Sequence, residues 1–151
     1  MIVTPAQRWS AVIPIDAVIL AAGALLTLGS YLLPWYSDVD RPTRQVTGLG
    51  RANDPALELH SARLNWMVAA AAIVALLLAT RRLAGQVGAS WRHAAAAVSA
   101  LAAAGALFDF LTVPDGMTPA HGMVFASVGA GATAVGALLC RQRIGRLERR
   151  E

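Results

Sequence analysis

The sequence predicts an all-α fold, a bundle of four transmembrane helices with a small-residue packed interior. The 151 residues contain four apolar stretches, each with one carboxylate at most and no other charge. Each is close to the length of about 20 helical residues that crosses a hydrocarbon core about 30 Å thick. Arginines gather outside these stretches, and small residues recur inside them at helical spacing. The four predicted spans are residues 11–34, 64–80, 94–113 and 122–140.

A soluble, alanine-rich helical bundle is the alternative fold. A soluble helix shows a polar stripe that recurs about every 3.6 residues. Residues 64–80 and 94–108 carry no charge on any face, which favours the membrane. We therefore expect one membrane domain that takes up the whole chain, residues 1–151.

The first span, residues 11–34, is predicted to be an uncleaved helix, because its apolar core exceeds the about 7–15 residues of a signal peptide. Pro34 is expected to end this helix. An outer loop over residues 35–63 follows, with several turn signals. An Asp-Pro pair at residues 54–55 predicts the start of a helix over residues 56–63 that runs into the second span.

Short connections follow the later spans. Residues 81–93 are predicted to form an inner loop, and residues 114–119, with two prolines and a glycine, a tight outer turn. Residues 141–151 form an arginine-rich cytoplasmic tail, which we expect to be helical at the inner leaflet. Its predicted role is that of a stop-transfer flank, with binding of anionic lipids as the alternative.

Arginines set the predicted orientation. All thirteen basic residues are arginine, and cytoplasmic loops carry the excess of positive charge. With both termini in the cytoplasm, nine arginines lie inside and four outside, so the sequence predicts an N-in/C-in topology. The basic charge is assigned to orientation and not to nucleic-acid binding. Four tryptophans are expected at membrane interfaces, where an indole is stable: Trp9, Trp35, Trp66 and Trp91.

Each predicted span carries a stripe of small or polar residues, the pattern that lets helices pack closely in lipid. The stripe of the fourth span predicts close contact with another helix. It leaves open whether that helix is the first or third span of this chain or belongs to another protein. The stripe consists of Gly122, Ala126, Gly129, Thr133, Gly136 and Cys140.

Two carboxylates lie within the predicted spans, Asp16 near the inner end of the first and Asp109 near the outer end of the third. We expect them in opposite leaflets and out of contact. Intramembrane acids often relay protons or cations, which is one interpretation. The other is structural: Asp16 lies near a helix N-terminus, where the helix dipole favours it, and Asp109 binds a neighbouring hydroxyl or an outer arginine.

No sequence motif predicts a reaction, a cofactor or a metal. No histidine lies within a span to bind haem, and no glycine loop suits a phosphate. We therefore expect no enzymatic activity, no cofactor and no metal. The polar groups on the outer side match no metal-ligand spacing; they are Asp38, Asp40, His60, Asp115 and His121.

The end of the first span, residues 29–36, reads Gly-Ser-Tyr-Leu-Leu-Pro-Trp-Tyr, and a Thr-Gly step follows at residues 47–48. Together with the four-span layout, this resembles the small, uncharacterised four-helix membrane proteins of actinobacteria. The resemblance implies an envelope or accessory role in such bacteria. It assigns no catalytic residue.

We expect a non-catalytic accessory subunit of a larger bacterial inner-membrane complex, of a respiratory or lipid-transport kind. The alternatives are a small proton-coupled transporter that uses Asp16 or Asp109, and a membrane sensor whose outer loop binds a ligand. The expected partners are other membrane subunits and lipids, not nucleic acid. The other candidate interaction residues are of types typical of contact surfaces: Trp35, Tyr36, Arg41, Arg44, Gly122, Gly129 and Gly136.

Overall fold

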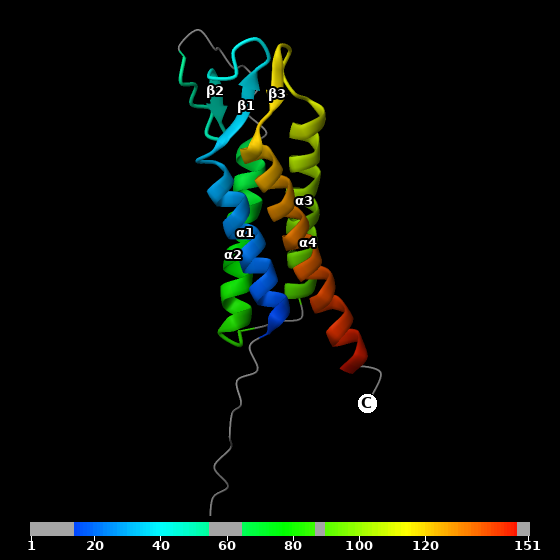
Figure 1. Ribbon diagram of the computed structural model, residues 1–151. Coiled ribbons are helices and arrows are strands. Elements are labelled where there is room, and N and C mark those ends of the chain that lie inside the picture. The colour runs from blue at the N-terminus through cyan, green and yellow to red at the C-terminus, as the bar shows by residue number, and fades with distance from the viewer. Residues whose placement is uncertain (1–13, 55–64, 87–89, 148–151) are drawn as a thin grey trace, which may run out of the picture.

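The computed structural model describes residues 14–54, 65–86 and 90–147. Four helices run up and down in turn, each antiparallel to the next along the chain (Figure 1). α1 and α3 each pack against both α2 and α4, so the helices form a ring. This confirms the four predicted helices. Their bounds are α1 Ile15–Ser30, α2 Asn65–Leu83, α3 Trp91–Leu111 and α4 His121–Leu147.

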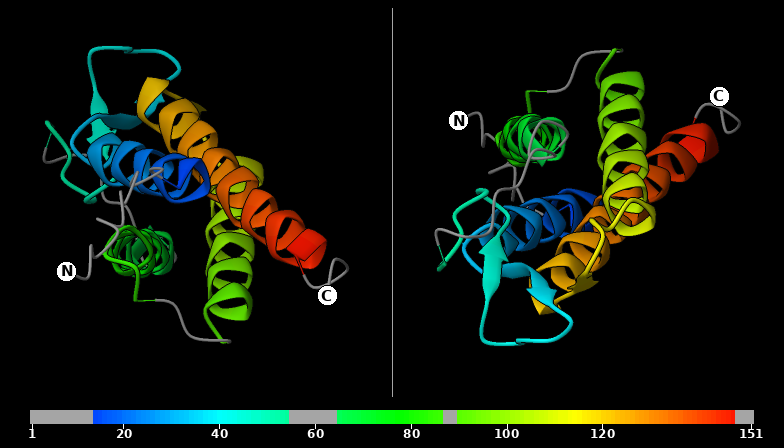
Figure 2. Two further views of the ribbon diagram at one scale, coloured as in Figure 1. Left: turned by 90° about the horizontal axis from the view of Figure 1, so that it is seen from below. Right: turned by 90° about the horizontal axis from the view of Figure 1, so that it is seen from above.

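A small antiparallel sheet lies at one end of the helices, so the prediction of an all-α fold is wrong there. β1 (Pro34–Asp38) lies between β2 (Gln45–Thr47) and β3 (Met117–Pro119). Tyr36, in the middle of β1, has partners in both neighbouring strands. We call these three strands the cap; it is seen from above in Figure 2, right.

The strands of the cap occupy segments for which the sequence predicted a loop and a turn. They have five, three and three residues, too few for an alternating apolar pattern to stand out. β1 and β3 are also separated in the chain by two helices, so no local turn signal announces their pairing.

α1 is shorter than the predicted span over residues 11–34. It begins after Pro14, whose ψ of 105° is extended, and it ends at Ser30. Pro34 already belongs to β1. Because the residue before a proline disfavours the α conformation, Leu33 does not continue the helix, which ends one turn earlier than expected.

The other helices agree more closely with the prediction. α4 continues to Leu147, so the predicted helical tail is confirmed over residues 141–147. The helix predicted over residues 56–63 lies outside the described residues.

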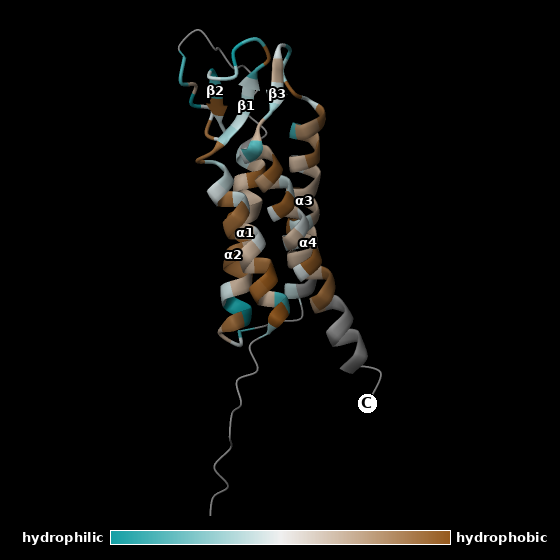
Figure 3. Ribbon diagram, in the orientation of Figure 1, coloured by the Kyte–Doolittle hydropathy of each residue, from teal (hydrophilic) through white to brown (hydrophobic). Residues whose placement is uncertain are grey.

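Among the described residues, three helices contain segments long and apolar enough to cross a membrane: Trp66–Leu83, His93–Leu111 and His121–Cys140. α1 is apolar too, but has 16 residues. Large apolar side chains face outward, among them Leu25 of α1 at 57% exposure and Val128 of α4 at 56%. Figure 3 shows apolar residues along the helices and hydrophilic residues mainly in the loops beside the cap. This distribution suggests a membrane protein whose outer surface contacts lipid.

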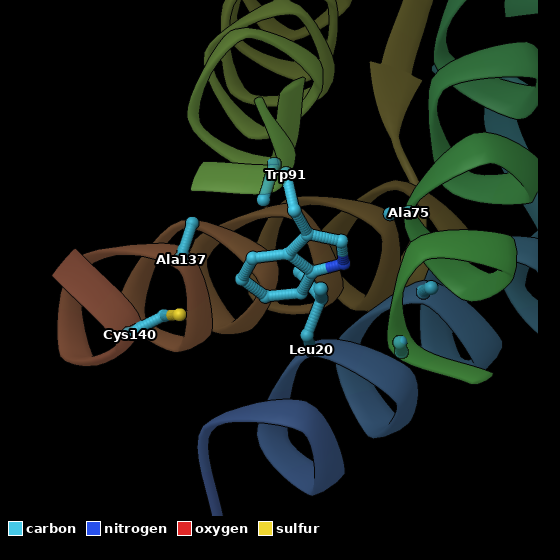
Figure 4. Close-up of a cluster of buried hydrophobic side chains, with 8 residues drawn as sticks. Leu20, Ala75, Trp91, Ala137 and Cys140 are labelled. Carbon is cyan, nitrogen blue, oxygen red and sulfur yellow. The ribbon is translucent and has the colours of Figure 1, made fainter. Parts of the chain in front are cut away.

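Small side chains dominate the seams between the helices, and one larger cluster joins all four. In this cluster Leu20 of α1 and Ala75 of α2 meet Trp91 of α3, beside Ala137 and Cys140 of α4 (Figure 4). The cluster lies toward the end of the bundle opposite the cap, which we call the base.

Two of the four tryptophans that the sequence places at membrane interfaces are buried in the protein. Trp35 has no exposed area and Trp91 is 4% exposed, whereas Trp66 at the start of α2 is 63% exposed. Trp9 lies outside the described residues. Trp35 and Trp91 therefore pack inside the protein.

Candidate functional site

The glycine stripe of α4 packs against α1. A Cβ atom placed on Gly129 would lie 2.7 Å from the backbone nitrogen of Thr27 and 2.8 Å from the carbonyl oxygen of Gly23. A Cβ on Gly136 would lie 2.7 Å from the nitrogen of Leu20. The two backbones therefore touch over about two helical turns. The neighbour that the sequence left open is the first helix of the same chain.

Buried hydroxyl groups lie along the same seams. Thr27 donates to the carbonyl of Gly23 at 3.0 Å, and Ser30 donates to that of Thr27 at 2.6 Å. Ser99 of α3 donates to the carbonyl of Thr133 on α4 at 3.1 Å and so joins two helices. The small and polar stripes are used inside this bundle, which confirms the predicted character of its interior.

Trp35 fastens the cap to the helices. Its indole nitrogen donates to the carbonyl of Ser30 at 2.9 Å, and its ring lies 4.7 Å from that of Tyr31. A Cβ on Gly48 would lie 2.6 Å from the indole, and one on Gly122 would lie 2.8 Å from it. The ring is thus held between two glycines and has no exposed area in this chain.

Tyr36 joins the cap to α3. It is 6% exposed, so it too is internal and not the surface residue that the sequence had suggested. Its hydroxyl donates to the backbone oxygen of Asp109 at 3.4 Å. Burial, and to a lesser degree the charge of Asp109, raise the pKa of the Tyr36 phenol from 10.0 to about 12. The phenol therefore remains a hydrogen-bond donor at neutral pH.

Asp109 itself is 4% exposed. Its Oδ2 atom is buried and has no hydrogen-bond partner among the described residues. Of the two neighbours expected for Asp109, a hydroxyl or an outer arginine, the structure places the hydroxyl of Tyr36 on its backbone oxygen.

A second buried carboxylate lies at the base. Asp16 is in the first turn of α1, as expected, and is 1% exposed. Its Oδ2 accepts a long hydrogen bond of 3.4 Å from Nε of Arg82, in the last turn of α2. The guanidinium carbon lies 5.7 Å from the ring centre of Trp91, whose Nε1 donates to Leu78 at 2.9 Å. The group therefore ties α1, α2 and α3 together.

Asp16 lies at the start of α1 and Asp109 near the end of α3. These two helix ends lie at opposite ends of the bundle (Figure 1), as the sequence predicted. Sequence reasoning missed their neighbours. Arg82 was assigned to orientation alone, although its place at the same end of the bundle as Asp16 was a usable signal. No local signal pointed from Tyr36 to Asp109, because strand and helix are far apart in the chain.

The two candidate arginines of the outer loop differ. Nε of Arg44 forms an ion pair of 2.7 Å with Oδ2 of Asp54, and both side chains are half-buried. Arg41 is exposed, and its backbone nitrogen donates to the carboxylate of Asp38 at 3.1 Å. Of the two, Arg41 is the one whose side chain can reach a partner.

Within the part of the chain that the structure describes, no three His, Cys, Asp or Glu side chains gather to hold a metal ion. His60, one of the outer polar groups, lies outside that part. The chain has no significant match among known protein families, curated proteins or solved structures.

Proposed function

We propose that this chain is a non-catalytic accessory subunit of a larger complex in the bacterial inner membrane, of a respiratory or lipid-transport kind. In this proposal the four helices are membrane spans, both termini lie in the cytoplasm, and the cap lies outside. The α1–α4 seam holds the chain's own helices together, so the contact with a partner must lie elsewhere.

The observation that carries the proposal is the exposed surface of the loops that follow β1 and β2 of the cap. Val39 is 56% and Leu49 is 40% exposed, although neither belongs to a helix that faces lipid. Arg41 and Arg51 are exposed beside them in the sequence. Apolar side chains together with arginine are typical of protein contact surfaces. We call these four residues the cap surface.

The loops that carry the cap surface follow strands that are fixed to the rest of the protein. β1 is hydrogen-bonded on both sides, and Trp35 anchors it through a fully buried ring. A surface fixed in this way loses little conformational freedom when a partner binds, which favours affinity.

Photocrosslinking in intact cells tests the proposal. A photoreactive amino acid at Leu49 is expected to crosslink to other membrane proteins, and one at the exposed Gln86, near the base, is not. Gentle extraction should give a particle well above 15.8 kDa plus the detergent micelle. The double variant Val39→Ser, Leu49→Ser should release the partner without lowering the thermal stability of the bundle.

Two results together would contradict the proposal. A clean monomer or homodimer after gentle extraction, with crosslinks from Leu49 to lipid alone, would reject an accessory subunit that docks through its cap.

A small proton-coupled transporter is the second candidate. The observation in its favour is that two buried carboxyl oxygens, Oδ1 of Asp16 and Oδ2 of Asp109, have no hydrogen-bond partner among the described residues. Proton flux into vesicles that contain the purified protein and a pH-sensitive dye tests this candidate. Flux that Asp109→Asn or Asp16→Asn abolishes supports it, and wild-type vesicles without flux reject it.

A further inference from the structure

The outward face of α2 combines apolar side chains with one arginine. Leu77 is exposed, and Arg81, one helical turn further toward the base, is exposed as well. Residues three and four apart lie on the same side of a helix, so these side chains form one continuous stripe that ends at the base. We call it the α2 stripe; it consists of Ile73, Val74, Leu77 and Arg81.

The two arginines in the last turn of α2 differ in their partners. Nε of Arg82 lies 3.4 Å from Oδ2 of the buried Asp16, and its guanidinium lies over the ring of Trp91. Arg81 forms no ion pair with any residue that the structure describes. The charge of Arg82 is therefore balanced inside the bundle, whereas the charge of Arg81 is left to interact with the surroundings.

The surface of the base carries positive charge. Asp16 is the one carboxylate of the described residues at this end, and it is buried. α4 brings three further arginines between residues 141 and 147, and no acid. An anion at the base therefore meets no exposed carboxylate among the described residues. The other described carboxylates lie toward the cap end: Asp38, Asp40, Asp54, Asp109 and Asp115.

We propose that the α2 stripe binds an anionic phospholipid, with the phosphate at Arg81 and an acyl chain along the apolar residues of the stripe. A guanidinium forms paired hydrogen bonds with phosphate, and an arginine near the end of a membrane helix extends toward the headgroups. A free phosphate ion would use the arginine alone, so the apolar part of the stripe favours a lipid. The inference rests on the helices spanning a membrane and not on the accessory role, so each can fail without the other.

Photoreactive lipids in vesicles test the proposal. The purified protein is placed in phosphatidylcholine vesicles with a trace of photoreactive phosphatidylglycerol or, in a parallel sample, of phosphatidylcholine with the same photoreactive acyl chain. Mass spectrometry then compares the crosslinks on α2. An arginine near anionic lipid contributes about 1 kcal/mol, which corresponds to about a fivefold preference. Because the acyl chains are identical, phosphatidylglycerol should exceed phosphatidylcholine on α2 by about this factor.

Arg81→Gln should remove the preference, because it removes the charge and keeps a good helix former. Arg41→Gln is the matched control, because it removes an exposed arginine beside the cap; it should keep the full preference. About 1 M salt, which shortens the Debye length to about 3 Å, should weaken the preference of wild type. The salt comparison needs no variant, so the test stays decisive if Arg81→Gln does not fold.

Several outcomes would overturn the proposal. They are equal crosslinking of α2 by the two lipids in wild type, a preference that survives in Arg81→Gln or at high salt, and phosphatidylglycerol crosslinks confined to the end of α4. Glycerol phosphate in excess distinguishes the two sources of phosphate. It should leave the crosslinks unchanged, and their loss would indicate a site for the free anion instead of a lipid.

Discussion

The contact between α1 and α4 makes the sharpest prediction, because two glycines two residues apart on the same helix have opposite surroundings. A Cβ on Gly129 would meet the backbone nitrogen of Thr27 at 2.7 Å, the carbonyl oxygen of Gly23 at 2.8 Å and the hydroxyl of Thr27 closer still. A Cβ on Gly131 would meet nothing within 4 Å. The substitutions Gly129→Ala and Gly131→Ala therefore add the same methyl group to a closed and an open site.

The size of the effect follows from the geometry. Backbone atoms cannot rotate aside, so α1 must retreat by about 0.7 Å, from 2.7 Å to an ordinary contact of 3.4 Å. Such overpacking costs about 1–3 kcal/mol. Both substitutions also gain up to about 1 kcal/mol of helix propensity, and this gain cancels when the two variants are compared.

Thermal unfolding in the same mild detergent, followed by tryptophan fluorescence, measures the difference. About 1–3 kcal/mol corresponds to a Tm about 2–12 °C lower for Gly129→Ala than for Gly131→Ala in a chain of this size. Equal Tm values would refute the direct contact of the two backbones. The glycine stripe of α4 would then be available to a helix of another protein.

Two further predictions concern the base and the orientation. Arg82→Ala should lower the free energy of unfolding by about 1–3 kcal/mol, because it leaves Asp16 buried without its partner. Adding Asp16→Asn should restore part of this loss. Chemical denaturation of both variants measures the effect, and an unchanged free energy of unfolding in Arg82→Ala would contradict the prediction. With Cys140→Ser as background, a cysteine at the exposed Arg41 should react with an impermeant thiol reagent in intact cells, while one at the exposed Gln86 should not; the reverse pattern would contradict N-in/C-in.

The parts of the fold that could be predicted are those that depend on residues close together in the sequence. Small residues at spacings of three and four define the stripe of α4, and the structure places Gly129 and Gly136 in close contact with the backbone of α1. Asp16 and Asp109 were assigned to opposite ends from their positions within the spans alone. Helical spacing decides the first result and position along a span decides the second, so neither needed knowledge of the tertiary fold.

The cap could not be predicted, because what holds it together is not local. Trp35 is internal only since Gly48 and Gly122, from two distant segments, leave room for its ring. From the sequence alone these glycine contacts cannot be seen, and a tryptophan beside an apolar span is most often an interfacial anchor. The same holds for Tyr36, whose partner Asp109 lies beyond another helix.

The hydrogen bonds of Trp35, at the start of the cap, also compensate for the short length of α1. Sixteen helical residues at 1.5 Å each span roughly 24 Å, less than the about 30 Å of a hydrocarbon core. Where lipid replaces water, the backbone that follows must satisfy its own hydrogen bonds. Trp35 does so at the junction: its carbonyl accepts from the nitrogen of Ala120 at 2.8 Å, and its indole donates to Ser30. Non-helical chain can therefore follow α1 at a depth where an open loop would leave polar groups without partners.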